Sequence, residues 1–103
     1  MGPRLAAESY LSRHTGAQRF RVTLYGSLAA TGKGHLTDWA IYSVLGEERT
    51  EFVWHPDIVL PYHPNGMKFE VIDDEGQPRA PWTVYSVGGG ALAEEGTQGP
   101  ETP

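Results

Sequence analysis

The stretch Tyr25–Asp38, which reads YGSLAATGKGHLTD, brings glycines, one lysine and one histidine together just before a predicted helix. Glycines let backbone N–H groups approach a ligand closely, and the N-terminus of a helix favours an anion. We therefore expect Gly32, Lys33 and Gly34 to bind a small anion, such as the carboxylate of an amino acid. A tight strand-to-helix connection with an exposed Lys33 would explain the same residues and stays open as an alternative.

His35, in the same stretch, is the candidate general base. An imidazole at the N-terminus of a helix tends to stay neutral, because the positive end of the helix dipole disfavours its charged form. A neutral histidine can accept a proton at physiological pH. Asp38 could orient the ring or simply favour the start of the helix. A histidine that is exposed or hydrogen-bonded to a neighbour is the alternative interpretation.

The glycine-rich stretch does not fit a nucleotide-binding P-loop. Five residues separate Gly26 from Gly32, where the P-loop has four, and Gly34 follows the lysine where that loop has serine or threonine.

Two further tracts carry polar residues beside glycine: HPNGM at His63–Met67 and YSVGGG at Tyr85–Gly90. Proline fixes the backbone after His63, and Asn65 precedes glycine in a dipeptide typical of tight turns. Glycines after a strand indicate close approach to another backbone or to a ligand, which makes Ser86 a substrate-binding candidate. A plain turn and a flexible strand end are the alternatives. The four histidines show no regular ligand spacing, so we expect no metal site.

Composition excludes several classes of protein. The chain has 103 residues and a formal net charge of −5, which indicates one small domain without the basic surface of a nucleic-acid binder. It contains no cysteine, which excludes disulfides, a thiol nucleophile and an iron–sulfur cluster held by its own thiolates. No apolar run is long enough to span a membrane and no secretory signal is visible, so we expect a cytoplasmic location.

Periodicity and turn residues predict an α+β fold with a small mixed or largely antiparallel sheet and two helices packed on one face. We expect residues 1–92 to form the domain and residues 93–103 to form a disordered tail or linker. Phe20, Val22 and Leu24 should share one face of their strand, and Met67, Phe69 and Val71 should share one face of theirs, with Lys68, Glu70 and Ile72 opposite. Gly46 stands where a glycine commonly ends a helix. The predicted helices begin at Pro3 and Thr37, and the predicted strands are Phe20–Tyr25, Glu51–Trp54, Met67–Ile72 and Trp82–Val87, the last two as a hairpin.

The three tracts, in this order, resemble the beta domain of bacterial iron–sulfur-dependent L-serine dehydratases, which convert L-serine to pyruvate and ammonia. The resemblance runs from about Gly2 to Leu92. It implies a [4Fe–4S] cluster held by cysteines of another domain or subunit, namely a catalytic alpha domain, and an isolated chain that is inactive. It also implies that His35 is the general base and that His63 and Asn65 donate or orient hydrogen bonds at the substrate.

Two departures from the family pattern accompany the resemblance. Family members carry a Ser-Ser-Ser-His-Thr tract just upstream of the Met-Gly-Pro seen here, so an N-terminally trimmed domain is expected, and the connection from Gly46 to His55 is shorter than in many relatives. A homo-oligomer is compatible with the pattern. The alternative from another class is a non-catalytic module that senses an amino acid or small anion, or serves assembly. A pyridoxal-phosphate dehydratase is disfavoured, because the chain is too short for that fold.

Overall fold

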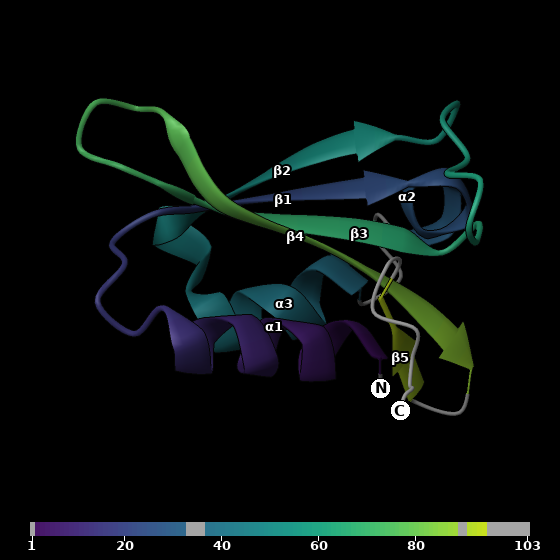
Figure 1. Cartoon of the computed structure of the whole chain (residues 1–103), viewed down its shortest axis with the longest axis horizontal. Helices are drawn as coiled ribbons and strands as arrows, with labels where there is room; N and C mark the ends of the chain where they lie inside the picture. Colours follow the sequence, from purple (N-terminus) through teal and green to yellow (C-terminus); the bar gives the residue numbers. More distant parts are fainter. Residues whose placement is uncertain (1, 33–36, 89–90, 95–103) are drawn as a thin grey trace.

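A five-stranded sheet with helices on one face makes up the computed structural model, which describes residues 2–32, 37–88 and 91–94 (Figure 1). Helices α1 and α3 lie side by side against that face, whereas α2 continues directly from the end of β1. The predicted α+β class is confirmed. The strands are β1 (Phe20–Tyr25), β2 (Thr50–His55), β3 (Gly66–Ile72), β4 (Pro78–Gly88) and β5 (Ala91–Ala93), and the helices are α1 (Gly2–Arg13), α2 (Gly26–Gly32), α3 (Thr37–Leu45) and the 3-10 turn η1 (Glu47–Arg49).

The sheet is mixed, with the strand order β2–β1–β3–β4–β5. β1 and β2 are parallel, and the remaining neighbours are antiparallel. Parallel strands need a crossover connection, which α2 and α3 supply between β1 and β2. The crossover carries α3 to the helical face, and the sheet then returns through the β3–β4 hairpin, as the sequence predicts. None of the described helices is long and apolar enough to cross a membrane.

The core lies between the sheet and the two helices α1 and α3. The predicted alternation of β1 is confirmed, because Phe20, Val22 and Leu24 are each almost completely buried. Gly46 ends α3 with a φ of 98°, and its N–H donates to the Tyr42 carbonyl oxygen at 2.8 Å, which is the predicted role of a C-terminal glycine. Other core side chains come from every layer: Ala6, Ala7, Tyr10, Ala29, Ile41, Leu45, Met67, Phe69 and Val84.

The predicted alternation of β3 is confirmed by its pairing with β1. Val71 lies opposite Phe20 in the same unbroken register that places Phe69 opposite Val22, so Val71 shares the core face with Phe69. Glu70 and Ile72 lie on the other face, where they are only 7% and 8% exposed. On the side of β4 the register changes, because Phe69 lies opposite Trp82 whereas Val71 lies opposite Arg79. β4 therefore carries one extra residue, a β-bulge.

Two elements were not expected. The stretch after β1 forms the helix α2 rather than a glycine turn, because its Ser-Leu-Ala-Ala run favours helix and Ala29 is buried against the core. β5 pairs with β4 through Tyr85 and Ala93, where the sequence indicated only a flexible strand end. This strand ends at Ala93, one residue beyond the expected end of the domain.

Tyr10 of α1 stabilises the bulge of β4 from the helical face of the sheet. Its hydroxyl donates to the carbonyl oxygen of Ala80 at 2.7 Å, and Ala80 has a φ of 52°, which is rare for a residue other than glycine. Tyr10 is 1% exposed. Burial, and secondarily the nearby charge of Glu70, raises the pKa of the Tyr10 phenol to about 12.

This raised pKa predicts a loss of stability at alkaline pH. Folding favours the neutral phenol, so its contribution is complete below pH 10 and is lost as the pH rises towards 12, since the unfolded chain ionises first. The free energy of unfolding should fall by about 1.4 kcal/mol per pH unit across this window through Tyr10 alone. Urea unfolding at pH 8 and at pH 11 measures how far the free energy of unfolding falls between the two pH values. We expect this fall to be about 1 kcal/mol smaller in Tyr10→Phe than in the unchanged chain. Equal decreases would contradict the assignment.

Candidate functional site

The predicted site residues divide into two groups. Lys33, Gly34 and His35 lie outside the described residues, and Gly32 is the last residue of α2. His63, Asn65 and Ser86 are all described and half-buried, in the loop before β3 and near the end of β4.

Asn65 and Ser86 are joined by two hydrogen bonds. The backbone N–H of Ser86 donates to the Asn65 carbonyl oxygen at 3.0 Å, and the side-chain Nδ2 of Asn65 donates to the Ser86 carbonyl oxygen at 3.2 Å. The two residues extend the β3–β4 ladder, in which Gly66 lies opposite Tyr85. The HPNGM and YSVGGG tracts are therefore held together, with the Asn65 side chain acting as the clamp.

His63 has a defined tautomer when it is neutral. The backbone N–H of Asn65 donates to Nδ1 of His63 at 3.1 Å. A backbone N–H can only donate, so Nδ1 must be the accepting nitrogen and the ring hydrogen must sit on Nε2. His63 thus offers a hydrogen-bond donor to a ligand at Nε2, while its Nδ1 lone pair is already used.

The start of α2 packs against the same loop. The N–H of Ser27 donates to the Pro64 carbonyl oxygen at 3.2 Å. Gly26 has a φ of 52°, and a Cβ placed on it would lie 2.7 Å from that same oxygen. Glycine is therefore required where the chain leaves β1. The described parts of all three tracts meet at one end of the sheet, where β1 and β4 finish and β3 begins (Figure 1).

Gly2 belongs to this end of the molecule, although the sequence analysis did not single it out. It is buried, and a Cβ placed on it would lie 3.0 Å from Cβ of Ser86. The first turn of α1 thus lies against the Ser86 side chain. A Gly-Pro pair at a helix start was the available signal, but we interpreted only its proline.

Tyr62 completes the described neighbourhood. Its ring lies 4.7 Å from the ring of Tyr85, measured between centroids, and the Tyr62 side chain remains 50% exposed. The His63 ring is 6.4 Å from Tyr85. Within residues 2–32, 37–88 and 91–94, no three His, Cys, Asp or Glu side chains are grouped as a metal ion would require. The described surroundings are aromatic rings and hydrogen-bonding groups.

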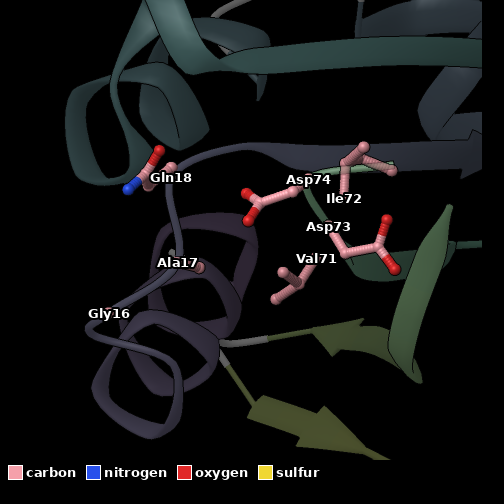
Figure 2. Close-up of a pocket in the computed structure, with 7 residues that line it drawn as sticks. All are labelled: Gly16, Ala17, Gln18, Val71, Ile72, Asp73 and Asp74. Carbon is pink, nitrogen blue, oxygen red and sulfur yellow. The ribbon is translucent and has the colours of Figure 1, made fainter. Parts of the chain in front are cut away.

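An open pocket of about 310 Å³ lies at the other end of the sheet (Figure 2). It is formed where the connection from α1 to β1 passes the end of β3, and Asp73 and Asp74 contribute its charged groups. The Arg79 guanidinium and the N–H groups of Gln77 and Glu75 bind the Asp73 carboxylate and lower its pKa. Asp73 therefore stabilises the hairpin turn, and none of the predicted site residues lines this pocket.

Comparison with known proteins identifies the family. The family model described as serine dehydratase beta chain matches residues 1–51 and 43–97, nearly the whole chain. This chain belongs to the serine dehydratase beta chain family. The three tracts that meet at one end of its sheet all lie within the residues that the family model matches.

Several curated relatives are L-serine dehydratases. The protein of Mycobacterium bovis is 34% identical over 139 aligned positions, which cover 96% of this chain and 30% of the relative. The protein of Streptomyces coelicolor is 31% identical and the TdcG protein of Escherichia coli 30% identical, over 31% and 30% of their own lengths. The chain therefore spans about a third of the length of these relatives.

The relatives also carry residues that this chain lacks. The alignment with the Mycobacterium bovis protein runs over 139 positions, whereas 96% of a 103-residue chain is about 99 residues, so about 40 positions of the relative face a gap. The family match is split where its two segments overlap, at residues 43–51. This break coincides with the end of α3, η1 and the start of β2, and it agrees with the short connection noted after Gly46.

The Asn65 clamp predicts a specific loss of stability. In Asn65→Asp a carboxylate oxygen would face the Ser86 carbonyl oxygen where an amide hydrogen now donates, so the free energy of unfolding should fall by about 1–3 kcal/mol. Ser86→Ala is the matched control, because both bonds use only the backbone of Ser86. Urea unfolding at pH 7 measures the two variants. A fully stable Asn65→Asp chain would show that the clamp contributes nothing.

Proposed function

We propose that this chain is the beta domain or subunit of an iron–sulfur L-serine dehydratase and helps to convert L-serine to pyruvate and ammonia. The observation that carries the proposal is the meeting of the three tracts at one end of the sheet, in a chain whose relatives are L-serine dehydratases. Membership of the beta chain family supports the same role.

The proposal divides the enzyme into two parts. The chain has no cysteine, and its described residues do not group as metal ligands, so they do not fit an iron–sulfur cluster. Cysteines of a catalytic alpha domain or subunit would hold the [4Fe–4S] cluster instead. In this division the present chain closes over the substrate and contributes polar groups, and it is inactive alone.

The chain's own residues have defined tasks in this scheme. His63 donates a hydrogen bond from Nε2 to an oxygen of L-serine, and Asn65 holds that ring through its backbone N–H. Lys33, with the backbone N–H groups of Gly32 and Gly34, binds the substrate carboxylate. His35 removes the α-proton as general base.

A second candidate is a module that binds L-serine, or another small anion, without turning it over. The observation that favours it is the state of the described polar groups: Nδ1 of His63 and Nδ2 of Asn65 are both engaged within the protein. What remains at His63 is the Nε2 hydrogen-bond donor, which suits recognition of a carboxylate or hydroxyl better than proton abstraction.

Pyruvate formation from L-serine, assayed anaerobically, tests the proposal. The chain would be assayed alone and after coexpression with a cysteine-bearing catalytic partner, in a version that includes the upstream residues. Activity in the assembly only, lost in air, is the expected result. Inactivity of a verified, cluster-loaded assembly would overturn the enzymatic role.

Ligand binding to the isolated chain separates the second candidate from the first. A rise in melting temperature with L-serine but not with D-serine would support a sensing module, because a ligand that binds only the folded state stabilises it. Ser86→Ala should weaken that rise, while leaving the melting temperature of the free chain unchanged. No rise with either enantiomer would contradict sensing and favour a half-site that needs its partner.

A further inference from the structure

β2 forms one edge of the sheet. Within residues 2–32, 37–88 and 91–94 it pairs only with β1, so its outer side presents backbone N–H and C=O groups without a ladder partner. The strand has six residues, about 20 Å of extended backbone. Such an edge is a template for pairing with another strand unless it is blocked by bulges, proline or inward-pointing charge, and β2 contains neither proline nor a bulge.

Aromatic side chains gather along this edge on the helical face of the sheet. Phe52 and Trp54 stack on each other with centroids 5.4 Å apart, and Tyr42 of α3 meets the edge of Phe52 at 4.9 Å. All three are only partly buried. Trp39, one helical turn before Tyr42, is 63% exposed. Aromatic residues are enriched in protein interfaces, and four of them beside an open strand indicate a surface that another chain covers.

The opposite face of the same strand carries Glu51, Val53 and His55. Glu51 lies near one end of the strand, where its Oε2 binds Nε of Arg21 at 3.0 Å. His55 lies at the other end, with its ring 6.0 Å from that of Tyr25. Val53 is half-buried between them. The strand thus carries a carboxylate towards its start, an imidazole at its end and an apolar centre.

We propose that two copies of this chain bind each other through β2, antiparallel and edge to edge, about a two-fold axis at Val53. A two-fold axis perpendicular to the sheet leaves the helical faces of both copies on the same side of the joined sheet. Residues that pair across the axis must then point to the same face, so the axis has to pass beside one residue of each strand rather than between two. With Val53 at the centre, Glu51 of each copy lies opposite His55 of the other, and Phe52 lies opposite Trp54. Centring on Phe52 would place Glu51 opposite Val53, and centring on Trp54 would place His55 opposite Val53.

The comparison with relatives bears on why this edge is open here. The family match breaks at residues 43–51, between α3 and β2, and we infer that most of the roughly 40 additional positions of the relative enter there. In this chain only Gly46 and η1 connect the two elements, and β2 begins at Thr50 directly after η1. No additional element is therefore inserted next to Trp39, Tyr42 and the edge strand.

The exposed apolar part of this surface is mainly Trp39, which is 63% exposed, whereas Tyr42, Phe52 and Trp54 are already partly buried within the chain. In the proposed dimer, backbone pairing of the six-residue strands and the two Glu51–His55 contacts would add to the apolar contact. The five-stranded sheets of the two copies would then continue into each other.

Cysteine cross-linking in the full chain tests the proposal, since the natural sequence has no cysteine. In the proposed register, Val53→Cys places two cysteines directly opposite, with Cα atoms about 4.5–5.5 Å apart, which suits a disulfide. Glu51→Cys and His55→Cys should not cross-link to themselves, because four residues of offset separate like positions by about 13 Å. A mixture of Glu51→Cys and His55→Cys chains should form the heterodimeric disulfide.

Analytical ultracentrifugation of the natural chain, which has no cysteine, measures its oligomeric state directly. The unchanged chain should be dimeric at micromolar concentration, and Val53→Lys, which sets two like charges opposite each other, should raise the dimer dissociation constant at least about tenfold. Val59→Lys is the matched control, because Val59 is 62% exposed in the loop after β2. A monomeric chain would overturn the proposal. A dimer that cross-links in another pattern, or that Val53→Lys leaves intact, would overturn it equally.

Discussion

Gly26→Ala is expected to lower the free energy of unfolding by about 2–4 kcal/mol, more than any other single change considered for this chain. Two costs add. Gly26 has a φ of 52°, a backbone conformation that alanine adopts only with strain. Its new Cβ would also stand 2.7 Å from the Pro64 carbonyl oxygen, a backbone atom that accepts a hydrogen bond from Ser27 and cannot swing away like a side chain.

Two other glycines separate these costs. Gly76 has a φ of 81°, but nothing lies within 4 Å of a Cβ placed on it, so Gly76→Ala should cost only the backbone strain, about 1 kcal/mol. Gly16 also has open space and no left-handed φ, so Gly16→Ala should be neutral or stabilising by up to about 1 kcal/mol. Urea unfolding of the three variants gives the comparison. If Gly26→Ala lost no more than Gly76→Ala, the contact with Pro64 would be too soft to matter.

The steric argument links the fold to the candidate site. Moving Pro64 away from Gly26 would move the loop that carries His63 and Asn65, and with it the clamp to Ser86. We therefore expect Gly26→Ala to disturb ligand binding as well as stability.

The elements that sequence analysis predicted correctly are those with strong local patterns. The alternation of Phe20, Val22 and Leu24 is visible within six residues, and β1 has the predicted bounds. The turn residues between β3 and β4 gave the hairpin in the same way, and Asp73 confirms their chemistry by binding the N–H groups of Glu75 and Gln77. Each of these signals depends on near neighbours only.

The features that were missed depend on distant residues. The left-handed φ of Ala80 could not be predicted from the residues next to it. The bulge is held by the Tyr10 hydroxyl, which belongs to a helix 70 residues earlier in the sequence. β5 is only three residues long and is a strand because it pairs with β4, so its own sequence gives too little pattern to predict it. In α2, glycines at both ends suggested a turn, whereas burial of Ala29 against the core favours the helix.

The candidate site shows the same division. A turn at His63–Gly66 could be predicted from its proline and glycine, but its pairing with Ser86 follows from the β3–β4 register, and the burial of Gly2 follows from the position of α1. The tautomer of His63 required the position of the Asn65 N–H. The role of His35 remains a prediction from the sequence, since that residue lies outside the described ranges.

His35→Ala is expected to reduce turnover about 10²–10⁴-fold in an assembly with the catalytic partner, because removal of a general base costs that much. His14→Ala is the matched control, since His14 follows the end of α1 and belongs to none of the three tracts. Pyruvate formation at saturating L-serine measures both. Turnover of His35→Ala within a few-fold of the unchanged enzyme would remove His35 from the mechanism.

Variants of His63 distinguish an orienting histidine from a base. His63→Asn keeps an acceptor where Nδ1 binds the Asn65 N–H but loses the Nε2 donor, whereas His63→Gln keeps a donor near Nε2 and loses that acceptor. If His63 donates to L-serine, the Asn variant should raise KM for L-serine more than the Gln variant. The acidic limb of the pH–rate profile should persist in both and disappear only with His35→Ala, because a donor that never takes the proton cannot set that limb. If the acidic limb were lost in the His63 variants instead, His63 would be the general base and His35 would not. His63 could accept a proton only if its Nδ1 released the Asn65 N–H or its Nε2 lost its hydrogen during the reaction.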